Sequence, residues 1–177
     1  QKKIILTKNT LKFLNSFALL KRKNCKANII AVTGSAGKTS LKDMLKNLLQ
    51  NYGKTFASPK SFNNELGVPI SLSNLNLNHK FAVFEVGMSK AGEINKLASV
   101  IKPEIGIITN IAEAHIENFK NIKGIAKAKS EIIDNIEKNG KIILNRDDRF
   151  FHYLNKKAKS KKIKVISFGK SIHSNIR

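Results

Sequence analysis

The feature that most constrains the fold of this 177-residue chain is the alternation of short apolar runs with amphipathic segments. The strand-like runs are ANIIAVT (27–33), KFAVFEVG (80–87), EIGIITNI (104–111), KIILN (141–145) and KVISFG (164–169). Helical spacing of apolar residues marks a leading helix from about Thr10 and the segments 39–52, 92–102, 122–136 and 149–159. Apolar strands separated by helices predict βαβ crossovers, and therefore an α/β fold in which helices flank a parallel sheet.

The charge balance is strongly basic, with 33 Lys and Arg against 12 Asp and Glu and a formal net charge of +21. Nucleic-acid binding is therefore one hypothesis. However, the basic residues are mostly lysines spread along the chain, and aromatic residues do not alternate with them as on a base-stacking surface. We favour a lysine-rich surface that attracts anionic substrates, with no nucleic-acid partner.

The sequence contains few signals for secretion or membrane insertion. The single cysteine, Cys25, excludes an intramolecular disulfide and is typical of a reducing compartment. No apolar run reaches the length of about 18 residues that a membrane span needs, and FLNSFALLKRK is too short and too polar for a signal peptide. We expect a cytoplasmic protein that works as a monomer and has no membrane partner.

The stretch AVTGSAGKTSLKDML joins a predicted strand to a predicted helix and contains a phosphate-loop pattern. Gly34 and Gly37 allow backbone N–H groups to surround a phosphate, and the helix N-terminus adds positive potential. Lys38 is expected to reach the β- and γ-phosphates, and Thr39 to offer its hydroxyl to Mg²⁺. The common G-x-x-x-x-G-K-[ST] pattern has glycine where this chain has Val32. We nevertheless predict that the loop binds a nucleotide through Gly34, Ser35, Ala36, Gly37, Lys38, Thr39 and Ser40.

Further polar residues follow the ends of other predicted strands, where ligand sites gather in parallel sheets. Glu85 ends a buried strand and needs a partner there, either Mg²⁺ beside a nucleotide or a neighbouring lysine. His115 comes just after the next strand, although a lone histidine is usually structural. Asn63 and Asn64 lie in the polar loop SFNNELGVP, for which an Asx-type turn leading into a helix is the alternative.

Lys129 is an anomaly in the helical segment 122–136. It lies in the middle of an apolar stripe formed by Ile122, Ile125, Ala126, Ile132, Ile133 and Ile136. Lys127, Glu131 and Asp134 lie on the opposite side of the same helix. A lysine directed at the core is costly unless it is paired, neutral or chemically modified. The alternative is that Lys129 extends along the helix until its ammonium reaches solvent.

Taken together, these segments resemble the ATP-dependent Mur ligase family of peptidoglycan synthesis. VTGSAGKTSLKDML, SFNNELGVP, EVGMSKAGEI, NIAEAHIENF, GIAKAKSEII and ILNRDD occur in the family's order and spacing, from about residue 5 to the end. The shortened G-x-x-G-K-[ST] loop is the family's form, which accounts for Val32. Arg146 stands where the family usually has a small residue. Within the family, the likeness is greatest to members that add D-alanyl-D-alanine.

The resemblance implies roles for particular residues. Lys38, Lys129 and Asn64 would be catalytic, although either Asn63 or Asn64 could contact substrate. The Mg²⁺ ligands would be Thr39, Glu85, His115 and Lys129, the last as a carbamate. In the implied reaction, the terminal carboxylate of UDP-N-acetylmuramoyl-tripeptide attacks the γ-phosphate of ATP. The amine of D-alanyl-D-alanine then displaces phosphate from the acyl phosphate.

The resemblance also implies a domain organisation. The family's enzymes have three domains, and this chain is expected to hold an incomplete, P-loop-type central domain. Residues 1–24 would lead from a UDP-sugar domain and residues 25–177 would be the first part of the ATP-binding domain, without ligase activity on their own. The alternatives are a sister or folylpolyglutamate-type ligase that adds another amino acid, or a basic, non-catalytic module that binds nucleotide or nucleic acid.

Overall fold

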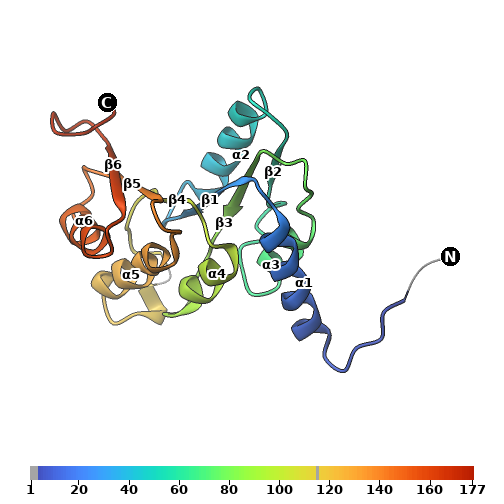
Figure 1. Ribbon diagram of the computed structural model, residues 1–177. Coiled ribbons are helices and arrows are strands. Elements are labelled where there is room, and N and C mark those ends of the chain that lie inside the picture. The colour runs from blue at the N-terminus through green and yellow to red at the C-terminus, as the bar shows by residue number, and fades with distance from the viewer. Residues whose placement is uncertain (1–3, 115) are drawn as a thin grey trace.

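The structure, a computed structural model, describes residues 4–114 and 116–177 and confirms the predicted α/β fold (Figure 1). Its parallel sheet has the strand order β2-β3-β1-β4-β5-β6. The strands are β1 (Asn28–Thr33), β2 (Thr55–Ala57), β3 (Phe81–Glu85), β4 (Ile105–Ile108), β5 (Lys141–Asn145) and β6 (Lys164–Phe168). The α-helices are α1 (Thr10–Asn24), α2 (Lys38–Leu49), α3 (Gly67–Ser73), α4 (Glu93–Ile101), α5 (Ile122–Lys129) and α6 (Phe151–Ser160). Two short 3-10 helices are η1 (Ile116–Asn118) and η2 (Ser130–Asn135).

Each predicted strand and helix is present, but two details differ from the sequence-based expectations. The predicted helix over 122–136 is divided into α5 and η2, because the Ser130 hydroxyl donates to the Lys127 carbonyl (2.7 Å) and competes with regular helical bonding. Helix α1 begins at Thr10, as expected, and its cap is Asn9, whose side chain accepts from the Lys12 amide. Strand β2 was not predicted, because three residues are too few to show a strand periodicity.

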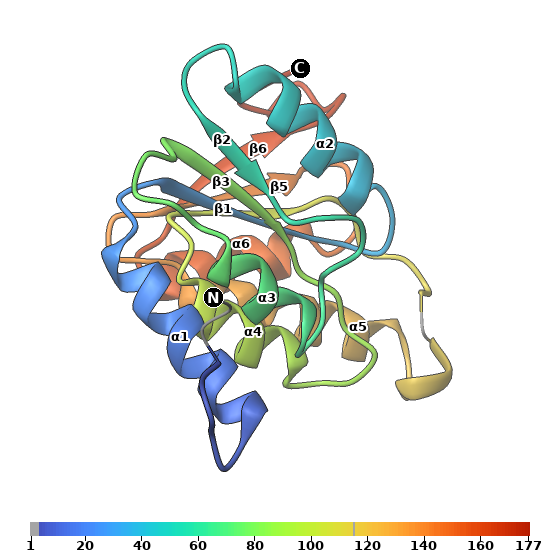
Figure 2. The ribbon, with the colours of Figure 1, turned by 90° about the vertical axis from the view of Figure 1, so that its right-hand side faces the viewer.

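The two faces of the sheet are covered unequally (Figure 2). On one face, α2 supplies Leu41, Leu45 and Leu49, which pack against a small buried cluster formed by Ile30, Val32, Val83 and Ile107. The opposite face carries the larger core, to which α1, α3, α4, α5, η2 and α6 all contribute. The carboxyl ends of β1, β3 and β4 meet where these two layers face each other, so the loops that follow them are brought together.

Helix α1 packs into the larger core through Ala18 and is linked by one arginine to the end of α4 and to β1. The Arg22 guanidinium donates to the Ile101 and Lys102 carbonyls (2.7 and 2.6 Å) and pairs with Glu104 (2.9 Å). The other carboxylate oxygen of Glu104 accepts from the Ile29 amide of β1 at 2.6 Å. This network fixes α1 against the end of α4 and the central strand.

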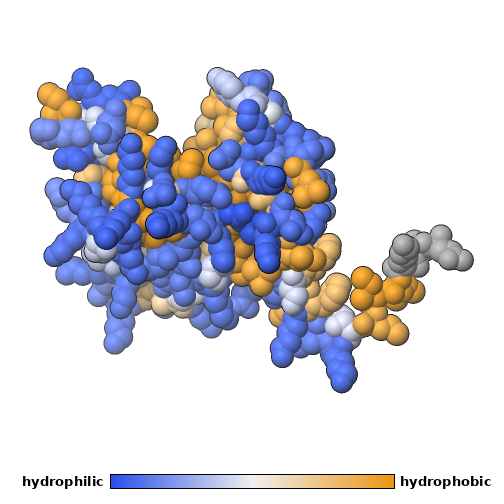
Figure 3. Space-filling view, viewed as in Figure 1, coloured by the Kyte–Doolittle hydropathy of each residue, from blue (hydrophilic) through white to orange (hydrophobic). Residues whose placement is uncertain are grey.

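The visible surface is mostly hydrophilic, as the lysine content predicts (Figure 3). An apolar patch stands out towards the N-terminal end of the chain, where the side chains of Ile4, Ile5 and Leu6 are largely exposed. None of the helices in the described part of the chain has the length and apolar character needed to cross a membrane.

Candidate functional site

The loop between β1 and α2 has the conformation that its glycines permit. Gly34 has φ +148°, and a Cβ atom there would collide with the Thr109 hydroxyl of the strand-end segment after β4. Gly37 has φ +80° and lies at the N-cap of α2, with open space around it. Helix α2 begins at Lys38, so its N-terminus points at the loop, as predicted for a phosphate site.

The same loop is held by residues that follow β4. The carboxamide oxygen of Asn110 accepts from the Ser35 and Ala36 amides (3.1 and 3.0 Å). The Thr109 hydroxyl donates to the Ala36 carbonyl at 2.6 Å, and the Ser35 hydroxyl donates to the Ala112 carbonyl at 2.9 Å. The sequence marked this strand end as a place where ligand-site residues gather. It did not reveal that Thr109 and Asn110 support the phosphate loop.

Glu85 lies at the carboxyl end of β3, as predicted, and its side chain is buried. One carboxylate oxygen accepts from the Thr39 hydroxyl and the other from the side-chain amide of Asn63, both at 2.7 Å. The Glu85 backbone amide donates to the Ser58 hydroxyl at 3.1 Å. A carboxylate and a hydroxyl at the edge of a phosphate loop are hard oxygen donors, which are the ligands that Mg²⁺ prefers. The Glu85–Thr39 pair therefore fits a Mg²⁺ site.

Lys38 and Lys129 converge on a single acceptor. Each side chain donates to the Gly34 carbonyl at 2.9 Å, Lys38 from the start of α2 and Lys129 from the end of α5. Lys129 is only 3% exposed, which confirms that it points inward and rules out the extended, solvent-reaching alternative. Burial, and secondarily the charge of Lys38, lower the pKa of Lys129 to about 8. Its amine is therefore more readily neutral than that of an ordinary lysine.

These elements surround a cavity of about 330 Å³ beside the phosphate loop. Its lining residues are Gly34, Ser35, Lys38, Asn63, Asn64, Glu65, Gly87, Met88, Ser89, Glu93, Leu97, Ala114 and Lys129. The cavity thus combines the loop, the two lysines and the two asparagines that the sequence singled out.

His115 lies outside the described residues. Within residues 4–114 and 116–177, no cluster of three or more His, Cys, Asp or Glu side chains could hold a metal ion.

The two asparagines make different contacts. The Asn64 side-chain oxygen accepts from the Leu66 and Gly67 amides (3.2 and 2.9 Å), as in the Asx-type turn leading into a helix, here α3. The Asn63 carboxamide instead reaches Glu85, and its backbone carbonyl accepts from the Gly87 amide at 2.9 Å. Both asparagines line the cavity, but Asn63 is tied to the candidate metal ligand, whereas Asn64 holds the turn that leads into α3.

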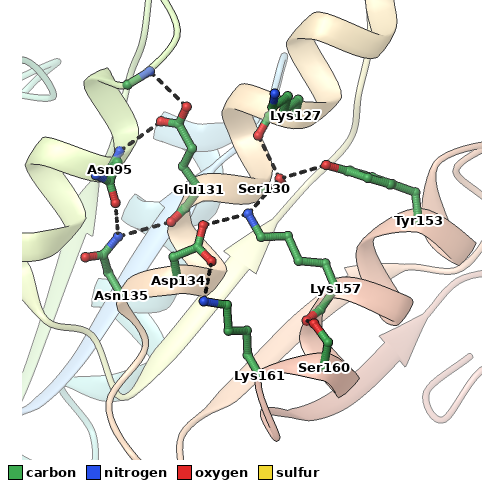
Figure 4. Close-up of polar contacts among 11 residues, drawn as sticks. Asn95, Lys127, Ser130, Glu131, Asp134, Asn135, Tyr153, Lys157, Ser160 and Lys161 are labelled. Atoms are coloured by element: carbon green, nitrogen blue, oxygen red, sulfur yellow. Dashed lines mark hydrogen bonds and ion pairs between the residues drawn. The ribbon is translucent and has the colours of Figure 1, made fainter.

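The turn that follows Lys129 is connected to α4 through Glu131 (Figure 4). Its two carboxylate oxygens accept from the Gly92 and Asn95 amides (2.8 and 3.0 Å) at the start of α4. Asn135 adds hydrogen bonds to the Asn95 side chain and the Glu131 carbonyl. Sequence reasoning placed Glu131 on the polar side of its helix and missed this role, because the partner backbone amides leave no signal in side-chain chemistry.

The other side of η2 is connected to α6 (Figure 4). The Lys157 ammonium donates to the Ser130 hydroxyl at 3.1 Å and pairs with Asp134 at 2.6 Å. Lys161 pairs with the second oxygen of Asp134 at 3.3 Å. Since Lys129 directly precedes Ser130, contacts on both sides of η2 fix the position from which Lys129 enters the cavity.

The ILNRDD segment also has a structural role. Asp148 accepts from the Ile111 amide at 2.7 Å, which joins the loop after β4 to the start of α6. Asp147 accepts from the Lys170 and Ser171 amides after β6. The Arg146 guanidinium lies over the Phe151 ring, 4.7 Å from its centroid, so this departure from the family pattern is accommodated by a cation–π contact.

Comparison with known proteins gives consistent matches. The family model of the Mur ligase middle domain matches residues 32–177. UDP-N-acetylmuramoyl-tripeptide–D-alanyl-D-alanine ligase of Rickettsia prowazekii (strain Madrid E) is 44% identical over 170 residues, which are 96% of this chain and 38% of that ligase. A crystal structure of MurF from Acinetobacter baumannii has a TM-score of 0.88 at 34% identity, covering 94% of this chain and 37% of that one. MurF from Thermotoga maritima in complex with ADP has a TM-score of 0.83 at 29% identity, covering 97% of this chain and 40% of that one.

Proposed function

Because this chain belongs to the Mur ligase family, we propose that it binds ATP and Mg²⁺ for the addition of D-alanyl-D-alanine to UDP-N-acetylmuramoyl-tripeptide. The observation that carries this proposal is the convergence of Lys38 and Lys129 on the Gly34 carbonyl, beside the Glu85–Thr39 pair. The names of the matched relatives favour this reaction over a sister ligase that adds a different amino acid.

In this reaction, a carboxylate oxygen of the acceptor attacks the γ-phosphorus of ATP, and the bond to the β-bridging oxygen breaks to release ADP. The incoming amine then attacks the acyl carbon, loses a proton and expels inorganic phosphate. Amides of the phosphate loop and Lys38 would hold the phosphates in line. Lys38 already points across the loop to the Gly34 carbonyl, so a short movement of its flexible side chain would bring the ammonium to a phosphate oxygen.

Thr39 and Glu85 would hold Mg²⁺, which neutralises charge on the phosphate oxygens when bound. Asn63 would keep the Glu85 carboxylate in place through its amide. His115, outside the described residues, remains part of the proposed ligand set on the family resemblance alone. Asn63 and Asn64 both line the cavity, but the side-chain amide of Asn63 is already bonded to Glu85. We therefore propose that Asn64 contacts the substrate.

Lys129 is proposed to act as a carbamate. A neutral amine attacks CO₂, forms a C–N bond and releases a proton, so the product carries a negative charge and two oxygen ligands. Burial lowers the pKa of Lys129 to about 8, which raises the neutral fraction. The side chain lines the same cavity as Asn63, whose side-chain amide contacts the proposed Mg²⁺ ligand Glu85.

The curated relatives are longer than this chain, which spans 38% of the R. prowazekii ligase. We propose that the chain works within an enzyme of that length, with residues 1–24 leading from a UDP-sugar domain and residues 25–177 forming the first part of the ATP-binding domain. The acceptor and the dipeptide would be held largely by the other domains.

The test is a ligation assay on the full-length protein. We expect phosphate release that requires ATP, Mg²⁺, UDP-N-acetylmuramoyl-tripeptide and D-alanyl-D-alanine together. Replacement of the dipeptide by single amino acids should reduce turnover to background. Turnover with another amino acid and not with D-alanyl-D-alanine would identify a sister ligase, and absence of any ATP-dependent ligation would contradict the proposal.

A further inference from the structure

Helix α2 contains a buried lysine for which the proposed mechanism has no use. Lys42 lies one turn after Lys38, is 1% exposed, and is among the largest fully buried side chains in the described part of the chain. A charged group is costly to bury unless it is paired or hydrogen-bonded. The inward-facing neighbours of Lys42 on this helix are the apolar Leu41 and Leu45, so packing alone would favour a hydrophobic residue.

The partner of Lys42 is a backbone carbonyl in the loop that carries the asparagines. Its ammonium donates to the Lys60 carbonyl at 2.7 Å and lies 3.5 Å from an oxygen of Asp43. Lys60 has φ +43°, a left-handed conformation that is unfavourable for residues other than glycine. Such a conformation persists only where the surroundings enforce it. Two hydrogen bonds hold the backbone here: the one from Lys42 to the Lys60 carbonyl, and the one from the Phe62 amide to the Pro59 carbonyl (3.0 Å), which closes the turn around Lys60.

The loop from Lys60 leads directly to the candidate metal ligand. After the turn at Lys60, the backbone amide of Asn63 donates to the Ser61 carbonyl at 2.7 Å. The side-chain amide of Asn63 donates to Glu85. At the start of the loop, the Ser58 hydroxyl accepts from the Glu85 backbone amide. The loop therefore contacts Glu85 at two points, and Lys42 holds the backbone between them.

From these contacts we propose that Lys42 is a positioning residue, which fixes the 58–64 loop so that Asn63 orients the Glu85 carboxylate for Mg²⁺. This inference rests on the proposed function, because it assumes that Glu85 holds Mg²⁺ beside ATP. Lys42 acts only through Asn63 and Glu85. It should therefore influence the Mg²⁺-dependent part of nucleotide binding and leave the phosphate loop itself intact.

The experiment compares Lys42→Met with Lys46→Met, a matched control at an exposed lysine one turn further along α2. ATP binding is titrated against Mg²⁺ by calorimetry. In Lys42→Met, we expect the Mg²⁺ concentration for half-maximal binding to rise about tenfold, as is typical when a residue behind a metal ligand is lost. Affinity for ATP without Mg²⁺ should stay within about twofold of wild type, and Lys46→Met should be unchanged on the same scale.

Hydrogen exchange of the protein without nucleotide gives a second readout, independent of activity and of metal. We expect Lys42→Met to speed exchange in peptides that cover residues 58–67, with the amides of β4 and β5 unchanged. Lys60→Gly, which keeps the carbonyl and suits the positive φ, should retain wild-type exchange and Mg²⁺ dependence. This variant separates the role of the Lys60 backbone from that of its side chain.

If Lys42→Met fails to fold, Lys42→Gln takes its place, because its neutral amide is one bond shorter and falls short of the Lys60 carbonyl. Wild-type Mg²⁺ dependence in either folded variant would overturn the inference. So would an equal loss of ATP affinity with and without Mg²⁺, which indicates general damage. If wild-type protein itself shows no Mg²⁺-dependent ATP binding, the proposed function fails first, and the two failures are thus distinguishable.

Discussion

Two buried lysines come from helices on opposite sides of the sheet, Lys42 from α2 and Lys129 from the end of α5 (Figure 2). Each donates to a backbone carbonyl, Lys42 to Lys60 at 2.7 Å and Lys129 to Gly34 at 2.9 Å. Their surroundings differ. Lys129 lines the cavity and faces a second cation, Lys38, whereas Lys42 is enclosed by a loop and lies near the Asp43 carboxylate.

The difference shows that burial alone does not identify a reactive lysine. Lys129 combines access to a cavity with a lowered pKa of about 8, which are the conditions for chemistry on its amine. Lys42 lies outside the cavity lining and its hydrogen bond is used to hold a backbone turn. We therefore propose a chemical role for Lys129 and a positioning role for Lys42.

The largest expected effect is a loss of ligation rate on substitution of Lys129, which substitution of an exposed lysine on the same helix should not cause. Lys129→Met should reduce ligation by the full-length enzyme on the order of a thousandfold, comparable to the loss of a key charge-stabilising group. Lys127→Met, at an exposed position of α5, should retain wild-type turnover. Initial rates of phosphate release measure both. Comparable activity of Lys129→Met and wild type would contradict a chemical role for Lys129.

The second effect is a pH dependence of stability that Lys129 should show. The Lys129 amine has a pKa near 10.5 in the unfolded chain and a pKa of about 8 in the folded chain. Between these values the unfolded state holds more of the proton, so the folded state gains stability as pH rises from about 8 to 10.5 and carries the full penalty below 8. The separation corresponds to about 3 kcal/mol.

Urea unfolding in CO₂-free buffer measures this effect. The free energy of unfolding of wild type should rise relative to Lys129→Met by about 3 kcal/mol as the pH approaches 10.5. Parallel pH profiles for the two proteins would show that the proton on Lys129 is not disfavoured by folding.

A smaller effect concerns how Lys129 is held. Glu131→Gln keeps the shape of the side chain but removes the charge that accepts from the Gly92 and Asn95 amides. We expect a loss of about 1–3 kcal/mol in unfolding free energy, because hydrogen bonds to a charged acceptor are replaced by weaker ones. The exposed Glu137→Gln is the matched control. Equal stability of the two variants would show that the carboxylate is not required.

The smallest effect is expected at the other side of η2. Asp134 pairs with Lys157 and Lys161 at partly exposed positions, where ion pairs contribute about 1 kcal/mol or less. Asp134→Asn should therefore lower the unfolding free energy by no more than about 1 kcal/mol at low salt, and by less at high salt. A larger, salt-independent loss would indicate that these contacts fix η2 more strongly than Glu131 does.

Much of the fold could be predicted from the sequence because its strands and helices carry strong periodic signals. The runs that became β1, β3, β4, β5 and β6 are apolar and are separated by amphipathic helices. Lys129 could be recognised because it interrupts an apolar stripe at helical spacing. The phosphate loop was identified from residues adjacent in sequence, Gly34 to Thr39, whose chemistry depends on local geometry.

The remainder depends on contacts between residues distant in sequence. Lys42 is buried by a loop 18 residues further along the chain, so its own helix gives no sign of it. Asn110 acts through backbone amides of the phosphate loop and Glu131 through those of α4, which no side-chain pattern reveals. Strand β2 owes its existence to pairing with β3. In each case the partner is a backbone group that only the tertiary fold brings near.

The central claim is that the phosphate loop and the Glu85–Thr39 pair form an ATP site that uses Mg²⁺. Its most direct test is calorimetric titration of the protein with ATP, with and without Mg²⁺, in wild type, Lys38→Met and Glu85→Gln. We predict saturable binding that Mg²⁺ strengthens, weakened under both conditions by Lys38→Met and only in its Mg²⁺-dependent part by Glu85→Gln. Absence of saturable ATP binding, or binding that neither substitution changes, would contradict the claim.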